Sequence, residues 1–255
     1  MPARDTFRGR LSRGGLVGSW LMLDLPELVE IMGVAGFDFV VVDLEHSAFG
    51  FDAVPRILSA AETSGISAIV RVEGKGSPHV AKALDLGADG VLIPQVETRD
   101  DARRAVAASK FAPLGSRGAC PRVRGARYGL TPSAEYYAAE NRLRTTMVLV
   151  ESPLGFENLD EILSVDGLDA VFFGFTDLSH ALGHAGQPNH PEVVRRIDDA
   201  IARVKARGLA AGLSCYDEAE ARRRIAAGVD FVTVAGAEKL FLDACRRTLA
   251  AVRGG

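Results

Sequence analysis

Eight short apolar runs recur along the 255-residue chain, and their alternation with longer amphipathic stretches limits the folds that the chain can adopt. The run Phe-Val-Val-Val at 39–42 is too short for a helix and too uniformly apolar for a half-exposed strand, so it predicts a parallel strand buried on both faces. The same interpretation applies to the other runs, at 16–21, 68–72, 90–93, 147–150, 170–173, 209–213 and 231–234.

The stretches between these runs have helical periodicity, for example at 52–64, 77–86, 99–110 and 217–227. Several end in a glycine, such as Gly36, Gly87 and Gly228, a residue favoured just past a helix C-terminus. The alternation predicts an α/β fold, a single-domain (β/α)8 TIM barrel over residues 1–255 with an N-terminal extension at 1–13. The competing fold is a doubly wound open sheet, but no G-x-G-x-x-G turn follows the first strand.

Composition excludes several classes of protein. The formal net charge is −3, so no basic field favours nucleic acid as a partner. The three cysteines form no C-x-x-C pair, which argues against a disulfide framework or a structural zinc and fits a reducing compartment. No apolar stretch is long enough to span a membrane, and the first 15 residues lack the apolar core of a signal peptide. We therefore expect a cytoplasmic protein with no membrane partner.

Titratable side chains appear abruptly where the predicted strands end. In a TIM barrel these positions face one common mouth, where ligands bind. Here they hold Trp20, Asp43, Glu45, His46, Arg71, Gln95, Glu151, Thr176, Asp177 and Ser214. The sequence therefore predicts a candidate active site at this rim.

Glu151 and Asp177 each follow an apolar run, so both carboxylates are expected to point into the mouth. Converging carboxylates repel each other unless a proton or a cation lies between them. Hard oxygen ligands favour a divalent ion such as Mg²⁺ or Mn²⁺, with Co²⁺ as a further candidate. The alternative from position alone is that both residues cap the helices that follow them.

His46 is the candidate base, and Asp43 is expected to fix the tautomer of its imidazole. Arg71 offers a permanent cation for a substrate carboxylate or a developing enolate. Each residue also has a structural alternative: His46 as a hydrogen-bonded histidine and Arg71 as part of a buried ion pair. His180 and His184 are spaced i, i+4, but they lack the glutamate of the H-E-x-x-H metal motif.

The segment 115–127 is rich in glycine and arginine and is long for a barrel loop. A mobile basic loop beside the mouth suits an anionic co-substrate, with Arg117 as a binding residue. Alternatively, its arginines form salt bridges at a subunit interface.

Taken together, these motifs resemble the HpcH/HpaI family of metal-dependent (class II) pyruvate aldolases, along nearly the whole chain. The resemblance rests on an ordered set: Gly18-Ser19-Trp20, Gly36-Phe37-Asp38, Asp43-Leu44-Glu45-His46, Arg71, Gly90-Val91-Leu92-Ile93-Pro94-Gln95, Gly115-Ser116-Arg117-Gly118, Glu151, Glu157-Asn158-Leu159 and Gly174-Phe175-Thr176-Asp177-Leu178-Ser179. It implies reversible cleavage of a 4-hydroxy-2-oxo acid to pyruvate and an aldehyde through a metal-stabilised enolate.

The resemblance also implies roles for individual residues. Residues matching Glu151 and Asp177 hold the ion in the family, and Glu45 would steady a water on it. His46 would be the base and Arg71 would steady the enolate, while the backbone amides of Thr176 and Asp177 receive the pyruvate carboxylate. Members are often hexamers in which the last helix packs on a neighbour, so a homo-oligomer is expected here.

Three departures from the family pattern concern the substrate pocket. Leu149 stands where a glutamine is common, Phe175-Thr176 replaces Pro-Ala, and Ala235-Gly236-Ala237 replaces Gly-Ser-Asp. They are compatible with an alternative on the same site, the condensation of oxaloacetate with an acetyl donor such as acetyl-CoA, as in citrate-forming relatives of siderophore pathways.

Overall fold

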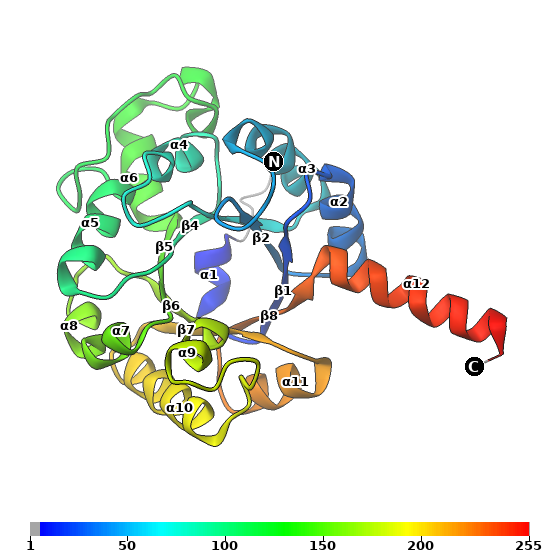
Figure 1. Cartoon of the computed structure of the whole chain (residues 1–255). Coiled ribbons are helices and arrows are strands. Elements are labelled where there is room, and N and C mark those ends of the chain that lie inside the picture. Colours follow the sequence, from blue (N-terminus) through cyan, green and yellow to red (C-terminus); the bar gives the residue numbers. More distant parts are fainter. Residues whose placement is uncertain (1–5, 255) are drawn as a thin grey trace.

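The computed structural model describes residues 6–254, and its centre is a closed barrel of eight parallel strands (Figure 1). Each strand pairs with the next along the chain, and the last pairs with the first. The strands are β1 (Leu16–Leu21), β2 (Phe39–Asp43), β3 (Ser67–Arg71), β4 (Gly90–Ile93), β5 (Thr145–Val150), β6 (Ala170–Phe173), β7 (Ala210–Cys215) and β8 (Phe231–Gly236). This topology confirms the predicted (β/α)8 barrel.

Helices surround the barrel as an outer layer, except for α1 at one end and α12, which runs outward (Figure 1). The helices are α1 (Phe7–Leu11), α2 (Pro26–Ala35), α3 (Val54–Ser64), α4 (His79–Asp85), α5 (Arg99–Ser109), α6 (Ser133–Leu143), α7 (Pro153–Glu157), α8 (Leu159–Leu163), α9 (Phe175–Ala181), α10 (Pro191–Ala206), α11 (Glu218–Ala226) and α12 (Ala237–Arg253), with 3₁₀ turns η1 (Phe51–Ala53) and η2 (Arg124–Gly129). In the described part of the chain, no helix is both long and apolar enough to span a membrane.

The strands are buried on both faces because alternate side chains enter two separate cores. In β2, Phe39 and Val41 point into the barrel, whereas Val40 and Val42 pack beneath the helices. Successive side chains of a strand point to opposite faces, so a strand covered on both sides must be apolar throughout. This is the physical reason for the uniform apolar runs in the sequence.

Some strands begin earlier than their apolar runs indicate. β5 starts at Thr145, ahead of the run at 147–150, and Thr145 and Thr146 pair with Gly90 and Val91 of β4. Threonine is β-branched and suits a strand, and both residues are buried. Apolar character alone therefore underestimates the length of the strand.

The predicted N-terminal extension contains α1, which closes the end of the barrel opposite the carboxyl ends of the strands. Phe7 is fully buried and packs edge-on against Phe39 and Phe231, at ring-centroid distances of 5.0 and 5.7 Å. Burial of such aromatic side chains stabilises the fold by about 1.5–3 kcal/mol each. With this end closed, the barrel opens only at the rim that carries the predicted site.

Four aspartates fix the strands at the closed end by the same device. Each stands one residue before an even-numbered strand and accepts a hydrogen bond from a backbone N–H of the preceding strand. The pairs are Asp38 with Val17 (2.9 Å), Asp89 with Ala68 (3.0 Å), Asp169 with Thr146 (2.8 Å) and Asp230 with Ala211 (2.8 Å). We call these four contacts the aspartate clasps.

Candidate active site

The carboxyl ends of the strands and the first turn of α9 enclose a cavity of about 310 Å³. Eight of the predicted site residues line it: Trp20, Asp43, His46, Arg71, Glu151, Thr176, Asp177 and Ser214. Met22, Leu149, Phe172, Gly174 and Phe175 complete the wall. Residues from distant parts of the sequence thus meet at one mouth because parallel strands all end on the same side of the barrel.

Arg71 and Asp43 form a buried ion pair in the wall of the cavity. The register of β2 and β3 sets the two residues directly opposite each other. The guanidinium binds the carboxylate through two bonds, Nε to Oδ1 at 2.8 Å and Nη2 to Oδ2 at 2.5 Å. Nη1 lies 3.2 Å from Glu45 Oε2, and the guanidinium carbon lies 4.4 Å from the centre of the Trp20 ring. Arg71 therefore forms the buried ion pair of the structural alternative. Its side chain also lines the cavity.

Asp43 orients the backbone that carries His46. This differs from the expectation that Asp43 contacts the imidazole itself. Its Oδ1 accepts hydrogen bonds from the backbone N–H groups of Glu45, at 2.9 Å, and His46, at 3.3 Å. The carboxylate is already engaged by Arg71, and the His46 side chain is exposed at the rim. Asp43 thus positions the turn that presents the imidazole to the cavity.

Glu151 and Asp177 form a coupled pair of carboxyl groups. Burial of Glu151, which is 9% exposed, is the main cause that raises its pKa to about 8, and the negative charge of Asp177 raises the pKa further. A hydrogen bond between the two side chains contributes in the same direction, whereas the backbone N–H of Gln95, 3.0 Å from Glu151 Oε1, opposes it. The two carboxyl groups therefore lie close enough for the charge of one to act on the other.

These residues fit a hard divalent ion. Two carboxyl groups that line the same cavity offer hard oxygen ligands, and a cation between them removes their repulsion. The helix-cap alternative does not hold for Glu151, because Ser152 is the N-cap of α7 and accepts from the N–H of Gly155. The alternative does not hold for Asp177 either, because Asp177 lies inside the first turn of α9 and the N-cap of that helix is Gly174.

A glycine makes room for Glu151. A Cβ atom at Gly174 would lie 2.8 Å from the Cβ of Glu151, which is closer than such atoms approach. A side chain at this position would displace the carboxylate from its partner. The close approach therefore explains why a glycine separates the β6 strand from the residue pair Phe175 and Thr176.

Trp20 and Ser214 are joined in the wall of the cavity. The indole N–H of Trp20 lies 3.1 Å from the hydroxyl of Ser214 and 2.9 Å from that of Thr233, and the two hydroxyls are 2.8 Å apart. The indole ring is thereby fixed beneath Arg71. Thr233 was not predicted, because it lies inside a strand and not after one.

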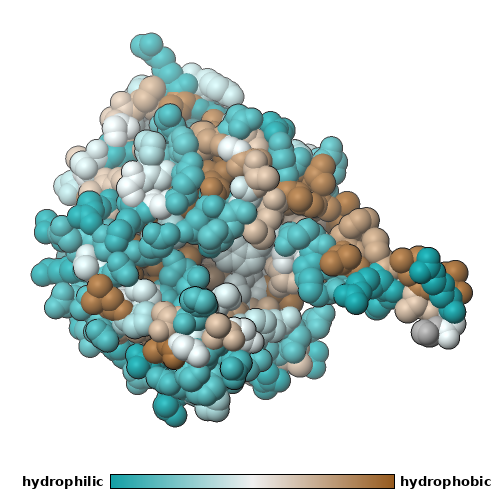
Figure 2. Space-filling model, in the orientation of Figure 1, coloured by the Kyte–Doolittle hydropathy of each residue, from teal (hydrophilic) through white to brown (hydrophobic). Residues whose placement is uncertain are grey.

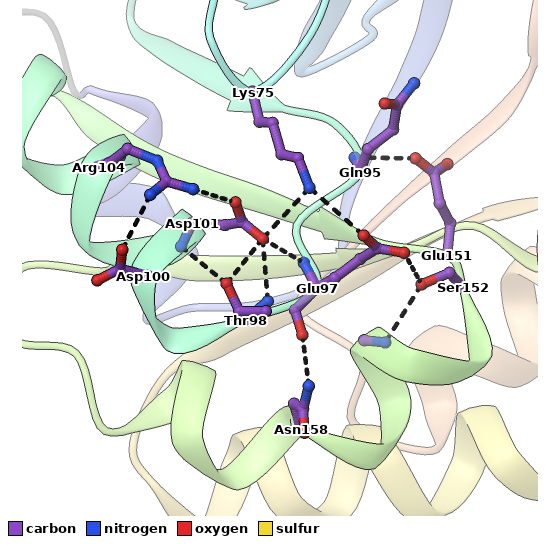
Figure 3. A network of polar contacts seen from close by, with 11 residues as sticks. Lys75, Gln95, Glu97, Thr98, Asp100, Asp101, Arg104, Glu151, Ser152 and Asn158 are labelled. Carbon is purple, nitrogen blue, oxygen red and sulfur yellow. Dashed lines mark hydrogen bonds and ion pairs between the residues drawn. The ribbon is translucent and has the colours of Figure 1, made fainter.

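Gln95 contacts two other predicted residues although it does not line the cavity itself. Its side-chain amide donates to Glu45 Oε1 at 2.9 Å. Its backbone N–H donates to Glu151 Oε1, a contact that Figure 3 shows. The φ angle of Gln95 is 58°, in the left-handed region that residues other than glycine rarely adopt. Strained backbone of this kind is found at functional sites, where the surrounding contacts enforce it.

Arg117 does not lie in the cavity, and its prediction as a substrate-binding residue is wrong. Its side chain is fully buried beside Asp85, at 2.6 Å, and Glu140, at 3.3 Å, and it stacks on Phe111. Asp85 and Glu140 belong to the last turns of α4 and α6, which run back toward the closed end of the barrel. Arg124, from the same segment, bonds to Glu62 and to the Leu86 carbonyl, so both arginines serve internal contacts.

His184 pairs with residues other than His180. Its Nε2 lies 3.1 Å from Glu192, and its ring stacks on His190 with centroids 3.5 Å apart. The i, i+4 spacing is not realised because α9 ends at Ala181, before His184. These histidines lie outside the lining of the cavity.

Tyr216 is a site residue that the sequence analysis missed. Its ring packs on Phe175 at a centroid distance of 4.4 Å. This contact supports the turn of α9 that carries Asp177. The position of Tyr216 directly after β7 was the available signal, because it shares that position with other rim residues.

Comparison with known proteins gives one family and several close relatives. Residues 16–244 match the family model described as HpcH/HpaI aldolase/citrate lyase. A 5-keto-4-deoxy-D-glucarate aldolase of Salmonella paratyphi C (strain RKS4594) is 38% identical over 218 residues, which are 86% of this chain and 84% of the relative.

Two solved structures are similar over nearly their whole length. An HpcH/HpaI aldolase/citrate lyase family protein from Burkholderia cenocepacia J2315 has a TM-score of 0.90 at 33% identity, covering 97% of this chain and 98% of that one. The citrate synthase SbnG has a TM-score of 0.88 at 26% identity, covering 97% of each chain.

Removal of Arg71 is expected to destabilise the protein strongly, because Asp43 is completely buried and would lose its partner. We expect Arg71→Ala to lower the free energy of unfolding by about 3–5 kcal/mol. Arg71→Lys should recover only part of this loss, since an ammonium cannot reproduce the two-pronged contact. Urea unfolding measures both. Arg103→Ala, which breaks an exposed pair with Asp100, serves as the control. Wild-type stability of Arg71→Ala would contradict this role.

The raised pKa of Glu151 predicts how the stability of the metal-free protein depends on pH. A carboxyl group with a higher pKa in the folded than in the unfolded state contributes most below its ordinary value of 4.5, and this contribution is lost as the pH rises to about 8. We expect a loss of a few kcal/mol at most across this interval. Glu151→Gln should remove this component, as should saturating Mg²⁺. Equal pH profiles for wild type and Glu151→Gln would refute the assignment.

Proposed function

Because the chain belongs to the HpcH/HpaI aldolase/citrate lyase family, we propose that it is a divalent-metal-dependent aldolase. The enzyme reversibly cleaves a 4-hydroxy-2-oxo acid into pyruvate and an aldehyde. The observation that carries this proposal is that the carboxyl groups of Glu151 and Asp177 line the same cavity as His46 and Arg71. An ion site beside a base and a fixed cation suits removal of a proton next to a carbonyl group.

Glu151 and Asp177 would hold the ion, with Mg²⁺ or Mn²⁺ preferred by their hard oxygen atoms. When bound, a divalent ion polarises a keto oxygen and makes the neighbouring C–H bond more acidic. Glu45 lies near enough to Arg71 and Gln95 to be held in place, and it would steady a water beside the pair.

The remaining steps belong to side chains of this chain. In cleavage, a base removes the proton of the 4-hydroxyl, the C3–C4 bond breaks, and its electron pair forms the enolate of pyruvate while the aldehyde leaves. Protonation of the enolate at C3 then gives the methyl group of pyruvate. We assign the proton transfer to His46, which stands exposed at the rim of the cavity.

Arg71 has hydrogen-bonding capacity left for the substrate. A guanidinium has five N–H groups, and each of its three nitrogens already contacts Asp43 or Glu45. If each contact uses one N–H group, the second N–H groups of Nη1 and Nη2 can face a developing negative charge, while the ion pair prevents the side chain from moving. The backbone amides at Thr176 and Asp177, in the first turn of α9, would receive the substrate carboxylate.

The condensation of oxaloacetate with acetyl-CoA to give citrate is the second candidate function. It is favoured by the similarity to the citrate synthase SbnG. The departures at Leu149 and Phe175, both of which line the cavity, are compatible with this reaction as well as with aldol cleavage. Citrate production from oxaloacetate and acetyl-CoA, against aldol cleavage of 4-hydroxy-2-oxo acids, distinguishes the two functions.

We also propose that a second copy of this chain covers α12. This 17-residue helix points away from the barrel, and among its residues only Ala237 is buried (Figure 1). Phe241, Cys245, Leu249 and Val252 recur at intervals of three or four residues, so they form one apolar face, which Figure 2 shows as brown surface along the helix. Phe241 is 67% and Val252 is 80% exposed. A helix that leaves such a face in water gains little stability alone.

Exchange of the pyruvate methyl protons in D₂O tests the enolate step without knowledge of the aldehyde. We expect exchange with Mg²⁺ or Mn²⁺, none in chelator, and none in Asp177→Ala. His46→Ala should keep the metal but lower the exchange rate by roughly 10²-fold or more. His79→Ala is the matched control, since His79 stacks on Phe51 outside the cavity.

Each result of this experiment has a definite meaning. Undiminished exchange in chelator would refute the metal assignment, and near-wild-type exchange by His46→Ala would remove His46 from the mechanism. Metal binding without any pyruvate exchange would favour the condensation of oxaloacetate instead.

Sedimentation of the full chain tests the association through α12. We expect wild type to sediment as an oligomer and the double variant Phe241→Glu, Val252→Glu as a smaller species, because two charges are placed on the apolar face. Arg247→Ala changes the opposite face of the helix and should not alter the mass. An unchanged mass in the double variant would contradict the proposal.

A further inference from the structure

The segment between β4 and α5 holds the backbone amide that contacts Glu151, yet its conformation is unfavourable in isolation. Gln95 is left-handed, with a φ of 58°. A residue with a Cβ atom rarely adopts this conformation, because its Cβ comes too close to the following carbonyl oxygen. Other contacts must therefore keep the segment in place and keep the Gln95 N–H directed at Glu151 Oε1, 3.0 Å away.

Three polar side chains connect this segment to the region just after Glu151 (Figure 3). The Ser152 hydroxyl donates to Glu97 Oε1 at 2.8 Å, and the Asn158 amide donates to the Glu97 carbonyl at 2.9 Å. Ser152 also accepts from the N–H of Gly155 at 3.2 Å. We call Glu97, Ser152 and Asn158 the latch.

The backbone on either side of Glu97 is held as well. Val96 donates its N–H to the Leu149 carbonyl at 3.1 Å, and Asp101 accepts from the N–H groups of Glu97, at 3.2 Å, and Thr98, at 3.1 Å. Lys75 lies 3.4 Å from both Glu97 and Asp101. The latch is therefore the part of this network that joins the segment to α7 and Asn158.

The contact between the two segments is also close. A Cβ atom at Gly155 would lie 2.9 Å from the Val96 carbonyl oxygen, so only a glycine allows α7 to approach the segment this closely. Ser152 immediately follows Glu151 in the chain, and Gln95 lies two residues before Glu97. A movement of either segment thus changes the distance between the Gln95 amide and the Glu151 carboxylate.

We propose that the latch positions Glu151 for metal binding by holding the Gln95 amide against one of its carboxylate oxygens. Glu97, Ser152 and Asn158 touch neither substrate nor ion and are positioning residues. The inference rests on the proposed function, because it assumes that Glu151 is a metal ligand. With Oε1 bound to the amide, the other oxygen is fixed in direction. Loss of the latch allows the strained segment to relax and the carboxylate to rotate.

Substitution of Glu97 tests the latch through metal binding and not through turnover. Glu97→Ala removes the acceptor for Ser152, and we expect the Mn²⁺ dissociation constant, from the electron paramagnetic resonance signal of free Mn²⁺, to rise about 10- to 100-fold. Asn158→Asp removes the other donor and should weaken binding in the same direction. Glu97→Gln keeps an acceptor oxygen and should bind Mn²⁺ nearly as wild type does.

Lys75→Met is the matched control, because it removes the charge beside Glu97 and leaves the contact with Ser152 intact. It should not change the Mn²⁺ dissociation constant. Urea unfolding of each metal-free variant separates a loss of positioning from a general loss of stability. Unchanged Mn²⁺ binding by Glu97→Ala would overturn the proposal, as would equal weakening in Glu97→Gln.

Hydrogen–deuterium exchange of the metal-free protein gives a second readout that does not depend on the proposed function. We expect faster amide exchange at residues 94–98 in Glu97→Ala, and wild-type exchange there in Glu97→Gln and Lys75→Met. If wild type binds no Mn²⁺, the proposed metal site is wrong, and amide exchange alone tests whether the latch holds residues 94–98 in place. Unchanged amide exchange in Glu97→Ala would show that the latch does not hold this segment.

Discussion

The ion pair of Arg71 and Asp43 connects most of the candidate active site. Asp43 is wholly buried and depends on Arg71 for its charge compensation, and it also fixes the backbone of the turn that carries His46. Arg71 contacts Glu45, which holds the Gln95 side chain, whose backbone in turn reaches Glu151. A contact between two neighbouring strands is thus continued across the rim by an ion pair and hydrogen bonds.

The barrel and most of the site could be predicted because both depend on simple periodicities. A strand covered on both faces has to be apolar, so its end is visible where Asp43, Glu151 or Ser214 interrupts the run. In a parallel barrel all such ends face the same mouth, so sequence position alone places these side chains together. The same reasoning cannot assign their partners, and Asp43 binds Arg71 where the imidazole of His46 was expected.

The residues that the sequence analysis misplaced or missed are those whose partners no periodicity specifies. Arg117 lies in a long segment without periodicity, and its sequence does not reveal that the chain turns back to pack the guanidinium against Asp85. Thr233 contributes from within a strand, and Glu97 acts through Ser152 and Asn158, which belong to a different loop. Contacts of this kind depend on how segments distant in the sequence are placed relative to one another, which no local pattern encodes.

The aspartate clasps bear on how the barrel reaches its correct strand alignment during folding. Each clasp requires a carboxylate one residue before a strand to meet one particular N–H of the neighbouring strand. A strand shifted by one residue would turn its inward side chains outward and lose its clasp at the same time. A misaligned barrel therefore loses both its core packing and its clasp hydrogen bonds, and the clasps lie at the end of the barrel opposite the candidate active site. The loops at the rim can therefore differ in sequence without affecting the alignment of the strands.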